Sequence, residues 1–252
     1  MHSKTLITVN TIHMKTYFKI ATALTIILSL SSCKFVGFNS KSAERNSIKN
    51  LITVDFDDED MIQISDTTLA FNSIECRGGV EIQLVKADKH KVLVSMHKSQ
   101  KDMFKMYVQG EELVIDASDK SFNSRNQKGI KVIIAAPVVY GIHAKGAIDF
   151  ETLGLVVNGD FGIRTDGASE IDIKGLKADN VYIETNGAGD VEISDLKTGK
   201  ITLRSSGASS AEISGVADRA EINLSGAGEV DLKNLVCSDI QTSKHGLGRI
   251  RR

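Results

Sequence analysis

The sequence predicts an all-β fold in which a right-handed parallel β-solenoid, or β-helix, of about five 20-residue coils follows a non-repeating, β-rich capping segment. One observation behind this prediction is a Gly-Ala pair that recurs at a nearly constant interval towards the C-terminus. Another is that, within each interval, two short runs of residues alternate between apolar and polar. A fixed period of this length is typical of repeat architectures, and alternation with a period of two is typical of strands that bury one face.

The glycine repeat occupies residues 141–252. By subtraction of their positions, its glycines are 21, 20, 20, 19 and 20 residues apart, and alanine follows each of them except the last. These structural corners are Gly146, Gly167, Gly187, Gly207, Gly226 and Gly246. Because glycine adopts positive φ angles without steric cost, we expect each of them to turn its coil, with the alanine pointing into the turn. Antiparallel hairpins also give paired strands at this spacing, but they do not require the same dipeptide at the same phase.

Each coil contains two predicted strands. In the coil that starts at Gly187, a first run alternates through Val191 and Ile193, and a second run alternates through Ile201 and Leu203. A third apolar residue lies between the two runs of successive coils, at Leu176, Leu196, Val216 and Leu235. The alternation places one side of every strand in a common core.

The first coil fits the same pattern only with an adjustment. If one residue is missing after Ala147, then Ile148 and Phe150 take the first strand and Leu153 takes the third apolar position.

Residues 48–140 form the predicted N-terminal β segment. Alternation is present, as in the run through Val80, Ile82 and Leu84, but the 20-residue period is not. The end of a solenoid leaves an unpaired strand edge, so we expect this segment to cap the first coil.

Residues 1–33 have the pattern of a lipoprotein signal peptide. From Met14, which we take as the true start, a basic stretch precedes an 11-residue apolar run and then Leu30-Ser31-Ser32-Cys33. This tetrapeptide is similar to a bacterial lipobox, after which a peptidase cuts and whose cysteine receives lipid. A plain signal peptide and a membrane-spanning helix are the alternatives, although the run is short for a span. We therefore predict lipidation of Cys33, attachment to the membrane through that lipid, and a polar tether at residues 34–47.

Two further cysteines, Cys76 and Cys237, fall in strand patterns of this exported chain. A disulfide between them and a pair of buried free thiols are both compatible with the sequence, because one sequence cannot place them close together. Free thiols are the simpler interpretation.

The order of the motifs resembles a known family. Phe71-x-x-Ile74 and Gly79-Val80-Glu81-Ile82 precede Glu112-Leu113-Val114-Ile115, Ala136-Pro137 and the serial glycine corners. Over roughly residues 68–252 this pattern is similar to the bacterial putative auto-transporter adhesin head GIN domain family, common in exported proteins of the Bacteroidetes group. The resemblance implies a β-helical fold and an adhesin-like role, and it brings no catalytic residues. The family's Gly-Ser-Gly-Asp-like corners are mostly Gly-Ala here.

No motif predicts catalysis or a cofactor. The stretch Gly207-Ala208-Ser209-Ser210-Ala211 lacks the final glycine of a nucleophile elbow. The formal net charge is −1 and 25% of the residues are charged, which does not favour a nucleic-acid partner. We predict that the protein is not an enzyme and needs no cofactor.

One column of like charges is a candidate cation site. Stacking of the coils is expected to align acidic residues on the outer face of the strand after each corner, namely Asp149, Asp172, Glu192, Glu212 and Asp231. Carboxylate oxygens are ligands that Ca²⁺ prefers. The alternative, which we favour, is a solvated face relieved by Lys174 and Lys233, with no metal bound.

Two functional interpretations remain. One is a lipid-anchored outer-membrane interaction module that presents a polar face to a surface protein or a glycan. The other is a periplasmic structural or accessory protein of an envelope assembly, and the sequence leaves open on which side of the membrane the domain lies. Among the aromatic residues from Gly146 onward, only Tyr182 is expected to point outward, because Phe150 and Phe161 fall at core positions. A sugar-binding groove on the solenoid therefore has little support in the sequence.

Overall fold

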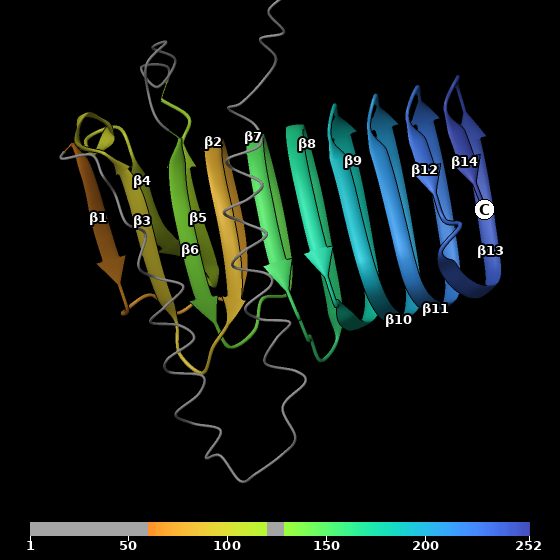
Figure 1. Cartoon of the computed structure of the whole chain (residues 1–252), viewed down its shortest axis with the longest axis horizontal. Coiled ribbons are helices and arrows are strands. Elements are labelled where there is room, and N and C mark those ends of the chain that lie inside the picture. Colours follow the sequence, from red (N-terminus) through yellow and green to blue (C-terminus); the bar gives the residue numbers. More distant parts are fainter. Residues whose placement is uncertain (1–59, 120–128) are drawn as a thin grey trace, which may run out of the picture. The chain divides into compact units, whose positions relative to one another are not determined.

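The computed structural model describes residues 60–119 and 129–252. They form a parallel β-solenoid of about six turns, which confirms the predicted fold class (Figure 1). The predicted signal peptide, the lipidation site Cys33 and the tether at residues 34–47 lie outside the described residues. Within the described part of the chain, no helix has the length and apolar character needed to cross a membrane.

One sheet of 14 strands winds through the described residues. In chain order the elements are β1 (Met61–Asp66), β2 (Ser73–Lys86), β3 (Lys91–His97), the 3-10 turn η2 (Lys98–Gln100), β4 (Lys105–Gln109), β5 (Glu112–Ala117), β6 (Ile130–Ala136), β7 (Gly141–Leu153), β8 (Asp160–Lys174), β9 (Lys177–Gly187), β10 (Asp190–Gly207), β11 (Ser210–Gly226), β12 (Glu229–Asp231), β13 (Leu235–His245) and β14 (Arg249–Arg251). Strands β2, β7 and β8 run through the glycine corner, whereas β10 and β11 run through the return turn on the opposite side of the coil.

The corner glycines stack directly on one another. Gly187 lies level with Gly167 on one side and with Gly207 on the other. At Gly207 the φ angle is +113°, and a Cβ atom there would lie 2.2 Å from the carbonyl oxygen of Gly187. The corner thus needs both a positive φ angle and close backbone approach, and only glycine supplies both.

The alanine after each corner does not point into the turn, contrary to our prediction. Ala168 and Ala208 are exposed, and the residues that follow them, Ser169 and Ser209, are buried. The pleat of the strand turns successive side chains to opposite sides, so the inward position falls one residue after the alanine.

The first coil needs no missing residue. Its register with β8 is continuous, so that Phe150 lies level with Ile171 and Asp149 with Glu170. The extra residue of this 21-residue interval lies instead between Val156, which bridges to Lys177, and the start of β8. In the register Leu153 lies level with Lys174, so the third apolar position of this coil passes from Leu153 to the buried Leu155.

The N-terminal segment both caps the solenoid and adds a turn to it. Gly78 in β2 lies level with Gly146, and Gly79 lies level with Ala147, so the corner ladder begins before the Gly-Ala repeat. Strands β5 and β6 pair with β2 in parallel on its other side. Antiparallel strands then close the stack, with β4 on β5, β3 on β6 and β1 on β3. This added turn accounts for about six turns where the repeat alone predicted about five.

The core is a continuous column of aliphatic side chains between the two walls of each coil. Its largest members, Phe150 and Phe161, are fully buried as predicted. Cys76 is a buried free thiol in the first turn, and Cys237 is a half-buried free thiol in the last turn. Strands β7 to β11 lie between them, and at about 4.8 Å per strand this separation rules out a disulfide.

Candidate functional site

The glycine corner divides the outer surface of the solenoid into two faces. We call the outward side chains that precede the corner the pre-corner face, formed by residues 73–77, 141–145, 160–166, 180–186, 200–206, 219–225 and 239–245. The outward side chains after the corner are the post-corner face, formed by residues 79–86, 147–152, 168–174, 188–194, 208–214, 227–231 and 249–251.

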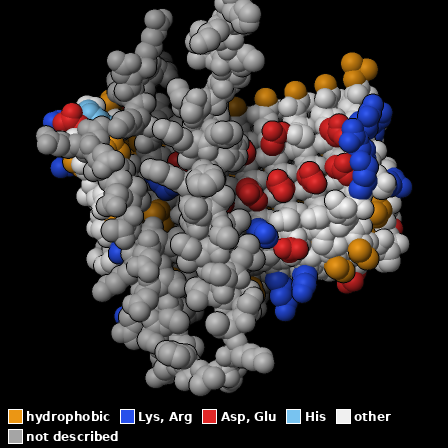
Figure 2. All heavy atoms as spheres, in the orientation of Figure 1, with side chains coloured by type: hydrophobic (Ala, Val, Ile, Leu, Met, Phe, Trp, Pro, Cys, Tyr) orange, Lys and Arg blue, Asp and Glu red, His pale blue; other side chains and the backbone are white. Residues whose placement is uncertain are grey.

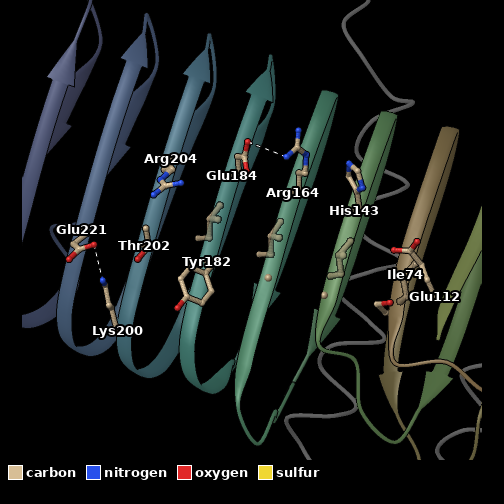
Figure 3. Close-up of a pocket in the computed structure, with 16 residues that line it drawn as sticks. Ile74, Glu112, His143, Arg164, Tyr182, Glu184, Lys200, Thr202, Arg204 and Glu221 are labelled. Atoms are coloured by element: carbon tan, nitrogen blue, oxygen red, sulfur yellow. Dashed lines mark ion pairs between the residues drawn. The ribbon is translucent and has the colours of Figure 1, made fainter. Parts of the chain in front are cut away.

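A groove of about 530 Å³ crosses the pre-corner face (Figure 3). It runs from Glu112 at one end to Glu221 at the other. Gly141, Gly162 and Tyr182 lie level with one another on successive turns. The groove is hollow at the two glycines because they have no side chain. We call this feature the Tyr182 groove.

One wall of the Tyr182 groove is made by three side chains from neighbouring turns. Tyr182 is 45% exposed and lies level with Thr202 on the next turn. Thr202 is only 8% exposed although it belongs to the outer face, and its Oγ1 is buried with no hydrogen-bond partner in the described structure. Arg204 lies two residues further along the same strand and is exposed.

Near Tyr182 the other charges of the groove are matched with one another, whereas Glu112 at the far end makes no ion pair among the described residues. The guanidinium of Arg164 lies 3.3 Å from the carboxylate of Glu184, and the ammonium of Lys200 lies 2.8 Å from that of Glu221. Among residues 60–119 and 129–252, Arg204 makes neither an ion pair nor a side-chain hydrogen bond. Arg204 is therefore the guanidinium of this groove that is available to an anion.

Beside the groove, a polar network holds two carboxylates in their charged form. Hydrogen bonds from Arg164, His143 and Asn186 hold the pKa of Asp166 well below its usual range. Burial acts to raise the pKa of Glu75, but hydrogen bonds from lysine and arginine neighbours outweigh it and leave the pKa below its ordinary value. The network holds His143 and Arg164, which line the groove, through their hydrogen bonds to Asp166.

The post-corner face carries two adjacent rows of acidic side chains, and Figure 2 shows acidic groups gathered there with basic ones at the C-terminal end. The first row follows the register through Glu81, Asp149, Glu170 and Asp190, is interrupted by Ser210, and resumes at Glu229. The second row runs through Glu151, Asp172, Glu192, Glu212 and Asp231. The predicted row is thus corrected at its first member, because the continuous register of the first coil places Glu151, and not Asp149, level with Asp172.

Like charges make these rows electrostatically unfavourable. Burial, then the neighbouring Asp172 and Glu212, raise the pKa of Glu192 above its ordinary value. Basic groups relieve the rows at their ends, where Lys131 contacts Glu81 at 2.6 Å and Lys233 contacts Asp231 at 3.3 Å. Lys174, expected to help, forms no ion pair within the described ranges.

A cation-binding role for the acidic rows stays a hypothesis. Within residues 60–119 and 129–252, no three side chains of the metal-binding types are grouped closely enough to hold an ion. Each row lies along the ladder and has at most one carboxylate per turn.

Sequence reasoning found Tyr182 as an outward aromatic residue but did not find the groove beside it. The groove depends on two glycines outside the Gly-Ala repeat, Gly141 and Gly162. By subtraction they precede Tyr182 by 41 and 20 residues, which are about two repeats and one repeat. This spacing could have indicated that the two glycines lie level with Tyr182 on the preceding turns.

Comparison with known proteins agrees with the resemblance in the sequence. The family model described as putative auto-transporter adhesin, head GIN domain, matches residues 70–251. A putative adhesin from Bacteroides fragilis has a similar structure at 17% identity and a TM-score of 0.58, covering 77% of this chain and 97% of that chain. A putative lipid binding protein from Parabacteroides distasonis is similar at 16% identity and a TM-score of 0.62, with the same two coverages. No curated protein matches the chain.

Proposed function

This chain belongs to the family of the putative auto-transporter adhesin head GIN domain, and from that premise we propose that it is a lipid-anchored, non-catalytic adhesion module of the cell envelope. In this proposal the lipid on Cys33 holds the chain to the outer membrane, and the solenoid presents its faces to a partner outside the cell. The short tether at residues 34–47 keeps the solenoid near the membrane.

The observation that carries the proposal is the regular stacking of the coils. Successive turns pair residue for residue, as between β10 and β9 or β10 and β11. Such a stack is stiff along its axis and repeats its outer side chains at about 4.8 Å per strand. A long, polar, regularly spaced surface suits recognition of another extended surface.

The non-catalytic part of the proposal rests on the state of the groove's ionisable groups. The carboxylates of the groove on the side of Tyr182 are Glu184 and Glu221, and both are engaged by cations at 3.3 Å and 2.8 Å. The groove carboxylate without an ion pair among the described residues, Glu112, lies four strands away from Tyr182 in the register. A general base needs a free carboxylate or imidazole within reach of the proton it removes. Groups held in ion pairs favour binding over proton transfer.

Exposure on the cell is tested by protease treatment of intact cells, followed by detection of residues 146–252. We expect this segment to be lost while a periplasmic control protein stays intact. Protection of the segment would overturn display outside the cell, and it would favour the periplasmic accessory role instead.

The anchor is tested by Cys33→Ala. We expect the variant to lose incorporation of labelled palmitate and to keep its uncut signal segment, while its folded domain keeps the far-ultraviolet circular dichroism of β structure. Cys237→Ala is the matched control, because Cys237 is in the solenoid, and it should keep the label. Equal incorporation of label by Cys33→Ala and by the wild type would contradict the lipid anchor.

A further inference from the structure

We propose that the Tyr182 groove binds an acidic saccharide, a hydroxylated sugar chain that carries carboxylate groups. The inference rests on the proposed adhesion function and names the ligand class for it. Its basis is a set of three adjacent groups with unused binding capacity, the ring of Tyr182, the hydroxyl of Thr202 and the guanidinium of Arg204.

The ring of Tyr182 stands beside a floor without side chains. Gly162 lies directly level with it, and Gly141 follows on the next turn, so the side of the ring that faces β8 borders an open hollow (Figure 3). A Cβ atom at Gly162 would meet nothing within 4 Å. An exposed aromatic ring beside such an open space is suited to stacking against the apolar face of a sugar ring.

Thr202 supplies an unmet hydrogen bond. Its side chain is 8% exposed and lines the groove, yet Oγ1 has no partner within the described residues. A buried hydroxyl without a partner is costly and uncommon in folded proteins. Because Oγ1 itself is buried, a ligand hydroxyl between Tyr182 and Arg204 reaches it once the Thr202 side chain rotates to another staggered χ1 position on binding.

Arg204 selects an anion. It lies two residues beyond Thr202 on β10, about 7 Å along the strand, and it forms no ion pair within the described residues. Glu184 lies level with Arg204 on the preceding turn, but its carboxylate pairs with Arg164 at 3.3 Å, and Lys200 pairs with Glu221 at 2.8 Å. A guanidinium binds a carboxylate through two parallel hydrogen bonds, so a carboxylate on the stacked sugar has a defined partner.

The length of the groove favours a chain over a single ring. Glu112 lies four strands away from Tyr182 in the register, through Ser73 and the two glycines, or about 19 Å. The volume of about 530 Å³ falls in the range of roughly 300–1,000 Å³ that is usual for small-ligand sites. The isoleucines of the groove, such as Ile163 and Ile183, are buried in the core, so the floor is backbone. A hydroxylated chain fits such a floor better than a peptide with apolar side chains.

Calorimetric titration of the full chain in detergent with an oligogalacturonate tests the proposal. The matched ligand is the same oligomer with its carboxyls methyl-esterified, which keeps the rings and removes the charge. We expect binding of the free acid and at least tenfold weaker binding of the ester, because the charged hydrogen bond to Arg204 is lost. Equal affinities would overturn the role of the carboxylate.

Four variants assign the binding to the groove. Arg204→Gln should weaken binding at least tenfold, whereas Arg219→Gln on the same face should not, because the guanidinium of Arg219 is already paired with Glu221 and Asp239. Gly162→Val should abolish binding by filling the hollow beside Tyr182 while the protein stays folded, since the space is open and valine favours strands. Tyr182→Ala should weaken binding through loss of stacking. Unchanged binding in Gly162→Val would overturn the site.

Two further outcomes decide the ligand class. Absence of binding to the oligogalacturonate by the folded wild-type chain would overturn the acidic-saccharide inference, and the adhesion proposal would still stand if the solenoid is removed by protease from intact cells. Tighter binding of a poly-glutamate peptide than of the oligogalacturonate would overturn the saccharide class.

Discussion

At the scale of single residues, the fold depends on glycines at positions where backbone atoms of neighbouring turns nearly touch. Gly187, Gly207 and Gly226 share positive φ angles and stand directly over one another. The same ladder reaches back to Gly78, where a Cβ atom would lie 2.2 Å from the carbonyl oxygen of Ala117. Each corner therefore depends on the absence of a side chain, and the residue after it has no such restriction.

Gly207→Ala should lower the free energy of unfolding by about 2–5 kcal/mol, since the new methyl group meets the Gly187 carbonyl and the φ angle of +113° strains any other residue. Gly79→Ala is the matched control. Gly79 lies where the other turns carry alanine, and a Cβ there meets nothing within 4 Å. Denaturant unfolding should show a stability equal to or above wild type for Gly79→Ala, and a similar loss in both variants would refute the corner argument.

Two buried threonines differ in whether their hydroxyl is satisfied. Thr202→Val removes the unpaired Oγ1 and should raise the free energy of unfolding by about 1 kcal/mol. Thr185→Val removes a hydroxyl that lies 3.1 Å from the Ser209 hydroxyl and should lower it by about 1 kcal/mol. Thermal unfolding without ligand measures both. A destabilised Thr202→Val would show that this hydroxyl has a partner.

At the scale of elements, each strand buries one side in the core and exposes the other on the outer surface. The pre-corner face and the post-corner face of that surface differ in how their charges are arranged. The pre-corner face pairs its charges across turns, as between Arg164 and Glu184. The post-corner face stacks like charges, as in Asp172, Glu192 and Glu212. Like charges that face each other in a sheet are destabilising, so the acidic rows reduce stability at neutral pH.

Glu192→Gln should stabilise the fold at pH 7 by a few tenths of a kcal/mol. The pKa of Glu192 is raised in the folded state by burial and then by its acidic neighbours. Its contribution to stability is therefore present below the ordinary pKa and lost as the pH rises through the raised value. The advantage of the variant should disappear on acidification below about pH 4.

Glu221→Gln provides the control of opposite sign. The hydrogen bond from Lys200 is the largest cause that lowers the pKa of Glu221, so its carboxylate stabilises the fold above its ordinary pKa. This variant should be less stable than wild type at pH 7 and approach wild type as the pH falls. Thermal midpoints measured from pH 3 to pH 8 follow both variants, and the same pH trend in both would contradict the assignment of the two faces.

The elements also show what could be predicted from the sequence. A fixed glycine spacing and period-two alternation define coils and buried faces, because equivalent residues in a stack meet equivalent neighbours. The turn at Gly78 was not predicted because β3 to β6 lie between Gly78 and Gly146 in the chain. The two glycines are therefore not separated by the 20-residue interval of the later turns. The groove was not predicted because it arises where Gly141 and Gly162 lack side chains on the outer face. The pattern of apolar residues describes only the buried face, so it does not indicate such gaps.

At the scale of the whole molecule, the solenoid is a one-dimensional stack whose turns contact only their neighbours. Gly167 and Gly207 flank the turn of Gly187 in the same geometry, with φ angles of +141° and +113°. Removal of a whole turn should therefore bring together two surfaces that already fit.

Deletion of residues 187–206 joins Asn186 to Gly207 and should leave a folded, shorter solenoid with a moderately lower melting temperature. Deletion of residues 187–207 is the control, because it removes the corner glycine and shifts every later side chain by one position, which turns core residues outward. Circular dichroism and cooperative thermal unfolding distinguish them. Loss of cooperative unfolding in the 20-residue deletion would mean that the turns are not interchangeable.

Display of the Tyr182 groove outside the cell to an acidic saccharide is tested by binding of a fluorescent oligogalacturonate to intact cells, measured by flow cytometry. Cells that carry the wild-type chain should bind the label, and cells that lack the chain, or carry equal amounts of Arg204→Gln, should bind little of it. Equal labelling of cells with and without the chain would show that the groove does not bind this ligand on the cell surface.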